Sequence, residues 1–241
     1  MTKPKIVAIH QPNIFPWLGY FDKLARADVF IFLDAVQFPK TGGVWTNRCK
    51  LLIHGQAAWV TLPIVRAYHG VRQINEMEIN ESTPWRDKLL KTIQMNYCRA
   101  PFFTQVFPLI NEMVNNPLKI LVEFNLNAIN VLIDALGLSG KELVLQSSLT
   151  VDSKATGLLI GLTRAVGGAA YLCGGGAEGY QEDNKFSAAG IELIYQNYHH
   201  PTYPQKGVAE FVPGLSVIDV LMNCGFDGTK HLIMDGNDKG K

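Results

Sequence analysis

The chain alternates between short apolar runs, which are typical of buried strands, and longer segments with helical spacing. Strands separated by helices of this length imply right-handed crossovers and a largely parallel sheet. We therefore predict an α/β fold with helices on both faces of the sheet. The expected strands cover residues 5–10, 29–34, 142–146, 169–173 and 191–196, and the expected helices cover residues 19–27, 156–166 and 183–188.

Two segments interrupt this alternation. Residues 50–53 and 58–64 flank a turn that contains Gly55, and they predict a small hairpin. Residues 84–137 carry helical signals, which begin with Thr83 as an N-cap and Pro84 as the first helical residue, and they predict a central helical block. No linker, repeat or low-complexity segment divides the chain. We expect a single domain over residues 1–234 and a disordered tail over residues 235–241.

The composition narrows the class of partner. The chain has 22 basic and 21 acidic residues and a formal net charge of +1, which provides no broad field for nucleic acid or anionic lipid. No apolar run is long enough for a signal peptide or a membrane span, so a cytoplasmic location is expected. The four cysteines are widely separated and form no C-x-x-C pair, which argues against a zinc site and a disulfide framework. We expect a small-molecule substrate and no metal or other cofactor, and a homo-oligomer stays open.

Polar residues cluster directly after each expected strand. In a parallel sheet these positions share the carboxyl edge, where α/β folds bind ligands. The sequence therefore predicts a site at this edge. The clusters are His10, Gln11, Asn13 and Trp17 after the first strand, Asp34, Gln37 and Lys40 after the second, Asp152 and Lys154 after the third, Gly174, Gly175 and Gly176 after the fourth, and Asn197, His199 and His200 after the fifth.

Several of these residues also have a structural interpretation. Pro12 and Pro16 stiffen the first loop, which is either a wall of the site or a rigid connector whose Trp17 caps the core. His10 is suited to proton transfer near neutral pH, but a histidine at a strand end is as often a structural hydrogen-bonding group. Asp34 follows an apolar strand, where a carboxylate must find a partner, and we favour a functional role for it.

The glycine run from Gly174 to Gly176, with Tyr180 after it, lets backbone N–H groups approach an anion closely. It has neither the spacing of a Walker loop nor that of a dinucleotide fingerprint. Cys173 at its edge is interpreted as a small core residue rather than a nucleophile. His199 and His200 are adjacent in an extended segment, so only one of them can face the site.

Five ordered blocks, spread over nearly the whole chain, read AIHQPNIFPWLGYFDKLARADVFIFLDAVQFPK, WTNRCK, YLCGGGAEGY, HHPTYPQ and GLSVIDVLMNCG. Together they resemble the WbqC-like family of bacterial proteins. A serine often stands at the position of Cys173 in that family, which weakens a thiol nucleophile further. The residues that match the family pattern are His10, Gln11, Pro12, Pro16, Gly19, Lys23, Asp34, Gln37, Trp45, Asn47, Arg48, Gly174, Tyr180, His200, Pro201 and Gln205.

The resemblance implies a role in the biosynthesis of O-antigen or another surface polysaccharide. The activity that it suggests is transfer of glycine or another small acyl group to the amine of a nucleotide-linked amino sugar. The rival hypothesis is a non-catalytic protein that binds a sugar nucleotide or scaffolds other enzymes, with Trp17, Trp45 and Tyr180 as stacking surfaces.

For the transferase, the expected base is His10 or His200, because the attacking amine must lose a proton. Gln11 and the glycine-loop N–H groups would stabilise the oxyanion, and Lys40 and Arg48 would hold phosphate. We expect His10, Asp34, Arg48, Gly175 and His200 to border one pocket. The catalytic candidates are His10, Gln11, Asp34 and His200, and the substrate-binding candidates are Asn13, Trp17, Gln37, Lys40, Trp45, Asn47, Arg48, Gly174, Gly175, Gly176, Tyr180 and Asn197.

Overall fold

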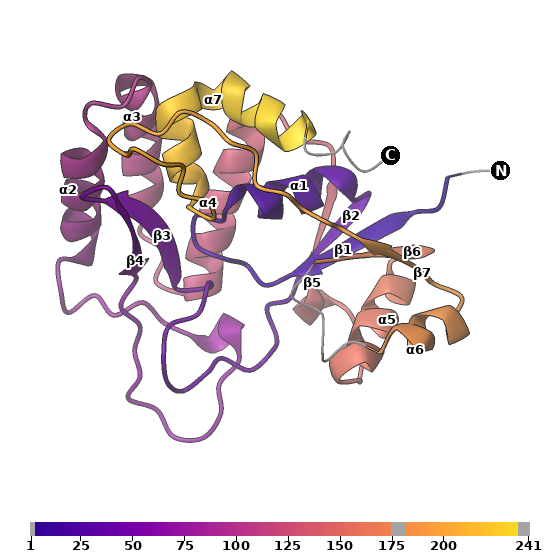
Figure 1. Ribbon diagram of the computed structural model, residues 1–241. Coiled ribbons are helices and arrows are strands. Elements are labelled where there is room, and N and C mark those ends of the chain that lie inside the picture. Colours follow the sequence, from indigo (N-terminus) through magenta and orange to yellow (C-terminus); the bar gives the residue numbers. More distant parts are fainter. Residues whose placement is uncertain (1–2, 175–181, 236–241) are drawn as a thin grey trace.

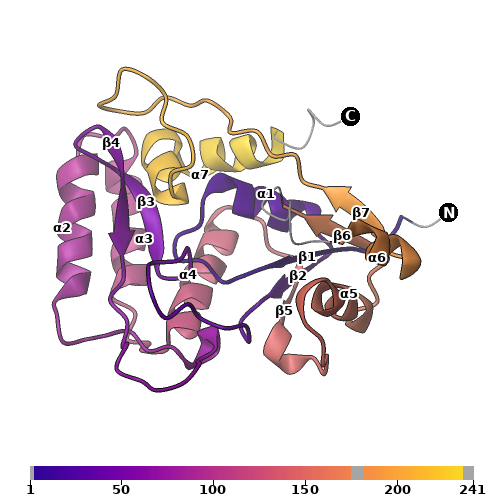
Figure 2. The same ribbon diagram turned by 60° about the horizontal axis from the view of Figure 1, so that its bottom comes forward.

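The computed structural model describes residues 3–174 and 182–235 (Figures 1 and 2). At its centre is a five-stranded sheet in the order β5-β2-β1-β6-β7, and every pair of neighbouring strands is parallel. This confirms the predicted α/β class. The strands are β1 (Ile6–His10), β2 (Val29–Phe32), β5 (Glu142–Leu145), β6 (Ala170–Cys173) and β7 (Glu192–Tyr195).

The order of the strands creates a divergence between β1 and β6. From β1 the chain moves outward through β2 to β5, and it then returns to the other side of β1 to form β6 and β7. At such a switch point the connections leave in opposite directions and open a crevice at the carboxyl ends of the two strands. His10 ends β1 and Cys173 ends β6, so the residues at this crevice follow directly from the topology.

Helices cover both faces of the sheet, as Figures 1 and 2 show. Helices α1 (Leu18–Arg26) and α7 (Val217–Asp235) lie on one face, and α5 (Ala155–Ala165) and α6 (Asp183–Ala188) lie on the other. Side chains of β1 alternate between the two layers: Val7 and Ile9 belong to the core under α5 and α6, and Ala8 belongs to the core under α1. The alternation therefore directs His10 toward α1, where its ring meets Tyr20 with centroids 4.8 Å apart.

A long insertion separates β2 from β5 and contains the predicted hairpin and helical block. A large apolar core joins this insertion to the layer of α1 and α7. Its elements are β3 (Arg48–Ile53), β4 (Gln56–Thr61), the short 3-10 helix η1 (Ile74–Glu76), α2 (Trp85–Tyr97), α3 (Phe103–Val114) and α4 (Leu121–Ala135), and a second 3-10 turn, η2 (Gln146–Ser148), follows β5.

The C-terminal helix α7 was not predicted from the sequence. It bends at Gly225, whose φ of 67° is in the left-handed region. Asp235 is the last residue of α7, and residues 236–241 of the expected tail lie outside the described residues. Within the described ranges, no helix combines the length and the apolar character needed to cross a membrane.

Asp219 fastens the segment after β7 to α7. This buried carboxylate accepts hydrogen bonds from the hydroxyls of Tyr97 (2.9 Å) and Tyr203 (2.8 Å) and from Nε2 of Gln205 (3.1 Å). Burial raises its pKa, and the three donors oppose this shift. The network joins α2, α7 and residues 203–205, so it holds the chain that leads from β7 into α7.

We predict that Asp219→Ala lowers the free energy of unfolding by about 3 kcal/mol, because it leaves three donors without an acceptor. Tyr203→Phe removes only one donor and should cost about 1 kcal/mol. Urea denaturation measures both values. Equal losses in the two variants would show that Asp219 is not the centre of the network.

Candidate functional site

Two cavities flank His10 at the carboxyl end of β1. The larger has a volume of about 690 Å³ and lies on the side of α1, and the smaller, of about 370 Å³, is walled in part by α5. His10 and Gly174 line both. The cavities therefore occupy the switch point of the sheet, where the topology places a ligand site.

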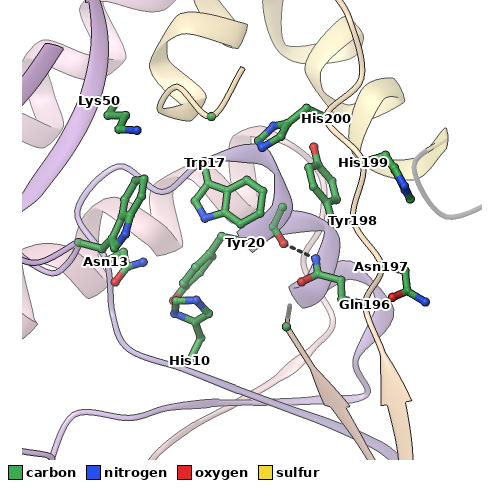
Figure 3. Close-up of a pocket in the computed structure, with 14 residues that line it drawn as sticks. His10, Asn13, Trp17, Tyr20, Lys50, Gln196, Asn197, Tyr198, His199 and His200 are labelled. Carbon is green, nitrogen blue, oxygen red and sulfur yellow. Dashed lines mark hydrogen bonds between the residues drawn. The ribbon is translucent and has the colours of Figure 1, made fainter. Parts of the chain in front are cut away.

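Most of the lining of the larger cavity comes from three stretches: residues 10–20, which lead from the end of β1 into α1; residues 45–50, which lead into β3; and residues 196–200, which follow β7 (Figure 3). Seven of the candidates from the sequence line it, namely His10, Asn13, Trp17, Trp45, Gly174, Asn197 and His200. The other lining residues are Gly19, Tyr20, Lys50, Gln196, Tyr198, His199 and Gly214.

The loop after β1 is held rigidly in place. Asn125 of α4 donates hydrogen bonds to the carbonyl oxygens of Pro12 (2.8 Å) and Thr46 (2.7 Å). Ser216 donates to the carbonyl oxygen of Phe15 (2.7 Å), whose φ of 38° is unusual for a residue other than glycine. The loop is thus both a stiff connector and a wall of the cavity, so the two interpretations of its prolines do not exclude one another.

His10 carries its proton on Nδ1. That nitrogen lies 3.0 Å from the carbonyl oxygen of Gln11, which can only accept, so Nε2 is left as a proton acceptor. The pKa of His10 is lowered to about 4. Burial is the main cause and the nearby charge of Lys23 the second, whereas the hydrogen bond to Gln11 acts in the opposite direction. At neutral pH the imidazole is therefore uncharged and has a fixed tautomer.

We predict that the His10 ring does not titrate between pH 5.5 and 8, because its folded-state pKa is about 4. The folded protein binds fewer protons than the unfolded chain between about pH 6.5 and 4. The contribution of His10 to stability is therefore complete above this window and is lost as the pH falls through it. NMR of the imidazole resonances tests the first point, with His10→Gln to assign them. A midpoint above pH 6 would contradict the prediction.

An aromatic group forms one side of the larger cavity. Trp17 lies 5.0 Å from Tyr198 and 5.1 Å from His200 between ring centroids, and Tyr198 and His200 are 5.2 Å apart. Figure 3 shows His200 beside Trp17, whereas His199 lies on the other side of the same segment. His200 is exposed at the rim, and partial burial lowers its pKa. Such rings offer stacking surfaces to a base or a sugar.

Gly19 allows Trp17 to take this position. A Cβ atom on Gly19 would lie 2.1 Å from the Trp17 ring. The backbone of Gly19 is also fixed, because Nε2 of Gln196 donates to its carbonyl oxygen (2.6 Å) and to Asp22 (2.7 Å). The six-membered ring of the indole thus packs against the first turn of α1 at Gly19.

We predict that Gly19→Ala displaces the indole of Trp17 and changes the tryptophan fluorescence of the folded protein, because the added methyl group occupies the space of the ring. Gly157→Ala in α5 is the matched control, since the nearest atom to its Cβ is the flexible hydroxyl of Ser153. Near-ultraviolet circular dichroism follows both variants. An unchanged aromatic signal in Gly19→Ala would contradict the assignment.

Three buried polar atoms at the larger cavity have no hydrogen-bond partner among the described residues. They are Oδ1 of Asn13 and the hydroxyl oxygens of Tyr20 and Tyr198. Buried polar atoms are nearly always paired, and an unpaired one costs about 1 to 3 kcal/mol. All three atoms belong to residues that line the larger cavity, as does His10.

Lys50 on β3 supplies a positive charge to this cavity (Figure 3). Its ammonium lies 4.9 Å from the ring centroid of Trp59 and 6.0 Å from that of Trp45. Arg48, two residues earlier on the same strand, stacks on Trp59 at 4.1 Å and does not line the cavity. The sequence drew attention to Arg48 and missed Lys50, although alternation along the strand places both on one face.

Asp34 and Asn47 have structural partners in the described structure. Asp34 accepts hydrogen bonds from the backbone N–H (2.9 Å) and the hydroxyl (2.6 Å) of Ser147, which fastens the turn after β5. Asn47 bonds to the backbone of Val44 and Leu62. Gln37 and Lys40 are exposed. The convergence expected at one pocket thus holds for His10 and His200 but not for Asp34 or Arg48.

The remaining candidates divide between the smaller cavity and the undescribed residues. Gln11 lines the smaller cavity, and its side-chain oxygen accepts a hydrogen bond from Thr46 (3.3 Å). Cys173 is fully buried at the end of β6. Gly175, Gly176 and Tyr180 lie outside the described residues.

The smaller cavity combines apolar walls with a buried lysine. Ile9, Leu33, Val36, Leu158, Leu159 and Tyr171 provide most of the lining. Lys23 of α1 is only 3% exposed and donates a hydrogen bond to the carbonyl oxygen of Ile9 (2.9 Å). Burial lowers its pKa to about 8, and the neighbouring Cys173 has a weaker, opposite effect.

The sequence model of the WbqC-like protein family matches residues 11–231, which contain nearly all of both cavities. The chain belongs to this family. A protein of Mycobacterium tuberculosis (strain ATCC 25618 / H37Rv) named uncharacterized protein Rv1507c is 27% identical over 232 residues, which cover 95% of this chain and 97% of the relative. No solved structure matches the chain significantly. In the described part of this WbqC-like protein, no three His, Cys, Asp or Glu side chains gather as metal ligands would.

Proposed function

We propose that the protein is a transferase of bacterial surface polysaccharide biosynthesis. In this proposal it moves a small acyl group to the amine of a nucleotide-linked amino sugar held in the larger cavity. The pathway and the type of reaction come from the family resemblance. The placement in this cavity rests on the neutral His10, which lines the cavity together with three residues that carry buried polar atoms without partners among the described residues.

The larger cavity offers the groups that such an acceptor requires. Its volume of about 690 Å³ is within the range of small-molecule sites. Trp17 and His200 would stack on the base, and Lys50 would hold the diphosphate. Asn13 and Tyr20 line the same cavity and would lie beside the sugar.

The reaction needs a proton acceptor next to the amine. The amine nitrogen attacks the carbonyl carbon of a thioester donor and forms the new C–N bond, while the C–S bond breaks. Nε2 of His10 takes the proton that the nitrogen loses and passes it to the departing thiolate, so amide and thiol are the products. The fixed tautomer of His10 keeps Nε2 ready to accept.

We predict that His10→Ala lowers turnover by about 10² and leaves the affinity for the nucleotide sugar almost unchanged, because a base acts mainly in the transition state. Lys50→Met should instead raise Kd about tenfold and spare kcat, since a phosphate contact is made equally in the ground and transition states. Calorimetry with nucleotide amino sugars and assays of thiol release measure the two effects.

His69→Ala is the control for a histidine substitution, because His69 is exposed in the loop between β4 and η1. The alternative function, a sugar-nucleotide-binding protein, makes a different prediction. Tight binding to the larger cavity without consumption of any acyl donor would favour that alternative over the transferase.

A further inference from the structure

We infer that the smaller cavity is the acyl site. It binds a short aliphatic acyl group whose carbonyl oxygen accepts a hydrogen bond from the ammonium group of Lys23. This inference rests on the proposed transferase and names its second substrate class. The cavity has about 370 Å³, which suits a short chain. It borders the larger cavity at His10 and Gly174, where an acceptor amine would meet the acyl carbon.

The burial and incomplete pairing of Lys23 point to a ligand. Its side chain is almost fully buried, yet it lines the cavity. An ammonium group has three N–H donors, and one of them bonds to the carbonyl oxygen of Ile9. Within the described residues, no hydrogen bond uses the other two, and the ring centroid of Tyr171 lies 5.9 Å from Nζ. A buried cation that is only partly paired is costly, so an oxygen-bearing ligand would relieve the deficit.

The walls define the rest of the ligand. Ile9 lies within β1 near its end, Leu33 directly follows β2, and Leu158 and Leu159 come from the first turns of α5. These side chains offer no hydrogen bonds, so they match an alkyl chain rather than a polar one. Free glycine fits poorly, because its ammonium group would lie among apolar side chains and near a second cation.

The position of Lys23 also suits the reaction. As the amine attacks, negative charge develops on the carbonyl oxygen, and a fixed ammonium group stabilises this oxyanion. Lys23 would therefore take the role that the sequence assigned to Gln11 and the glycine loop. His10, which lines both cavities, accepts the proton from the amine in the larger cavity.

Butyrate is a suitable probe, because its carboxylate resembles the charged oxygen and its chain matches the apolar walls. Calorimetry with the full-length protein in the absence of sugar should show that butyrate binds and that Lys23→Met weakens binding at least tenfold. Lys50→Met is the matched control: it removes the same charge from the other cavity and should leave butyrate affinity unchanged. Butyramide and glycine should bind at least tenfold more weakly than butyrate.

The pH dependence provides a further test. Butyrate affinity should fall as the pH rises from 7 to 9.5, because Lys23 loses its charge in this range. His10 faces Lys23 from β1, Tyr171 and Cys173 face it from β6, and Asp22 and Arg26 lie beside it on α1. Cys173→Ser should keep the same pH profile, which separates the amine from the thiol.

Leu159→Trp keeps Lys23 and fills the cavity, so it tests the inference if Lys23→Met does not fold. It should abolish butyrate binding and leave nucleotide-sugar binding intact. The inference is overturned if butyrate does not bind to the wild-type protein, if Lys23→Met or Leu159→Trp binds it normally, or if glycine binds as well. Failure of the proposed function shows separately, as absent sugar-nucleotide binding or absent turnover.

Discussion

Ser216 is the point at which the walls of the larger cavity meet. Its hydroxyl donates to the carbonyl oxygen of Phe15 in the loop after β1, and its backbone N–H donates to the carbonyl oxygen of Lys50 in the hairpin. The next residue, Val217, begins α7 and donates its N–H to Pro16. One buried serine thus joins three segments that are far apart in the sequence. The positions of these walls therefore depend on contacts between distant segments.

The parallel sheet and the insertion contribute different parts of the larger cavity. The sheet provides the switch point between β1 and β6, and hence the position of His10. The insertion between β2 and β5 provides Lys50 and, through Asn125, fixes the loop that carries Asn13 and Trp17. A parallel sheet by itself would leave this edge open to solvent. The insertion and the segment after β7 add walls to this edge and so form the larger cavity.

The sequence predicted the sheet well because each strand is a short apolar run bounded by polar residues. It missed α7, since Gly225 and Gly228 interrupt the helical pattern; in the structure the helix bends at Gly225 and continues through Gly228. The rule that polar residues follow strands selected His10, Asn13 and His200, which line the larger cavity. The same rule selected Asp34, whose partner Ser147 lies 113 residues away in the sequence. Local pattern cannot distinguish a carboxylate that faces a ligand from one that fastens a distant turn, and it cannot find Lys50 or Lys23, whose surroundings come from other elements.

The side chain of His10 lines both the larger and the smaller cavity, and this has a thermodynamic consequence. The charge of Lys23, which lines the smaller cavity, disfavours protonation of His10. The His10 side chain also lines the larger cavity. An anion that neutralises Lys23 therefore makes His10 a stronger base. Linkage is reciprocal, so protonation of His10 must in turn strengthen the binding of that anion by the same factor. Binding of an anion in the smaller cavity and protonation of His10 are therefore thermodynamically coupled.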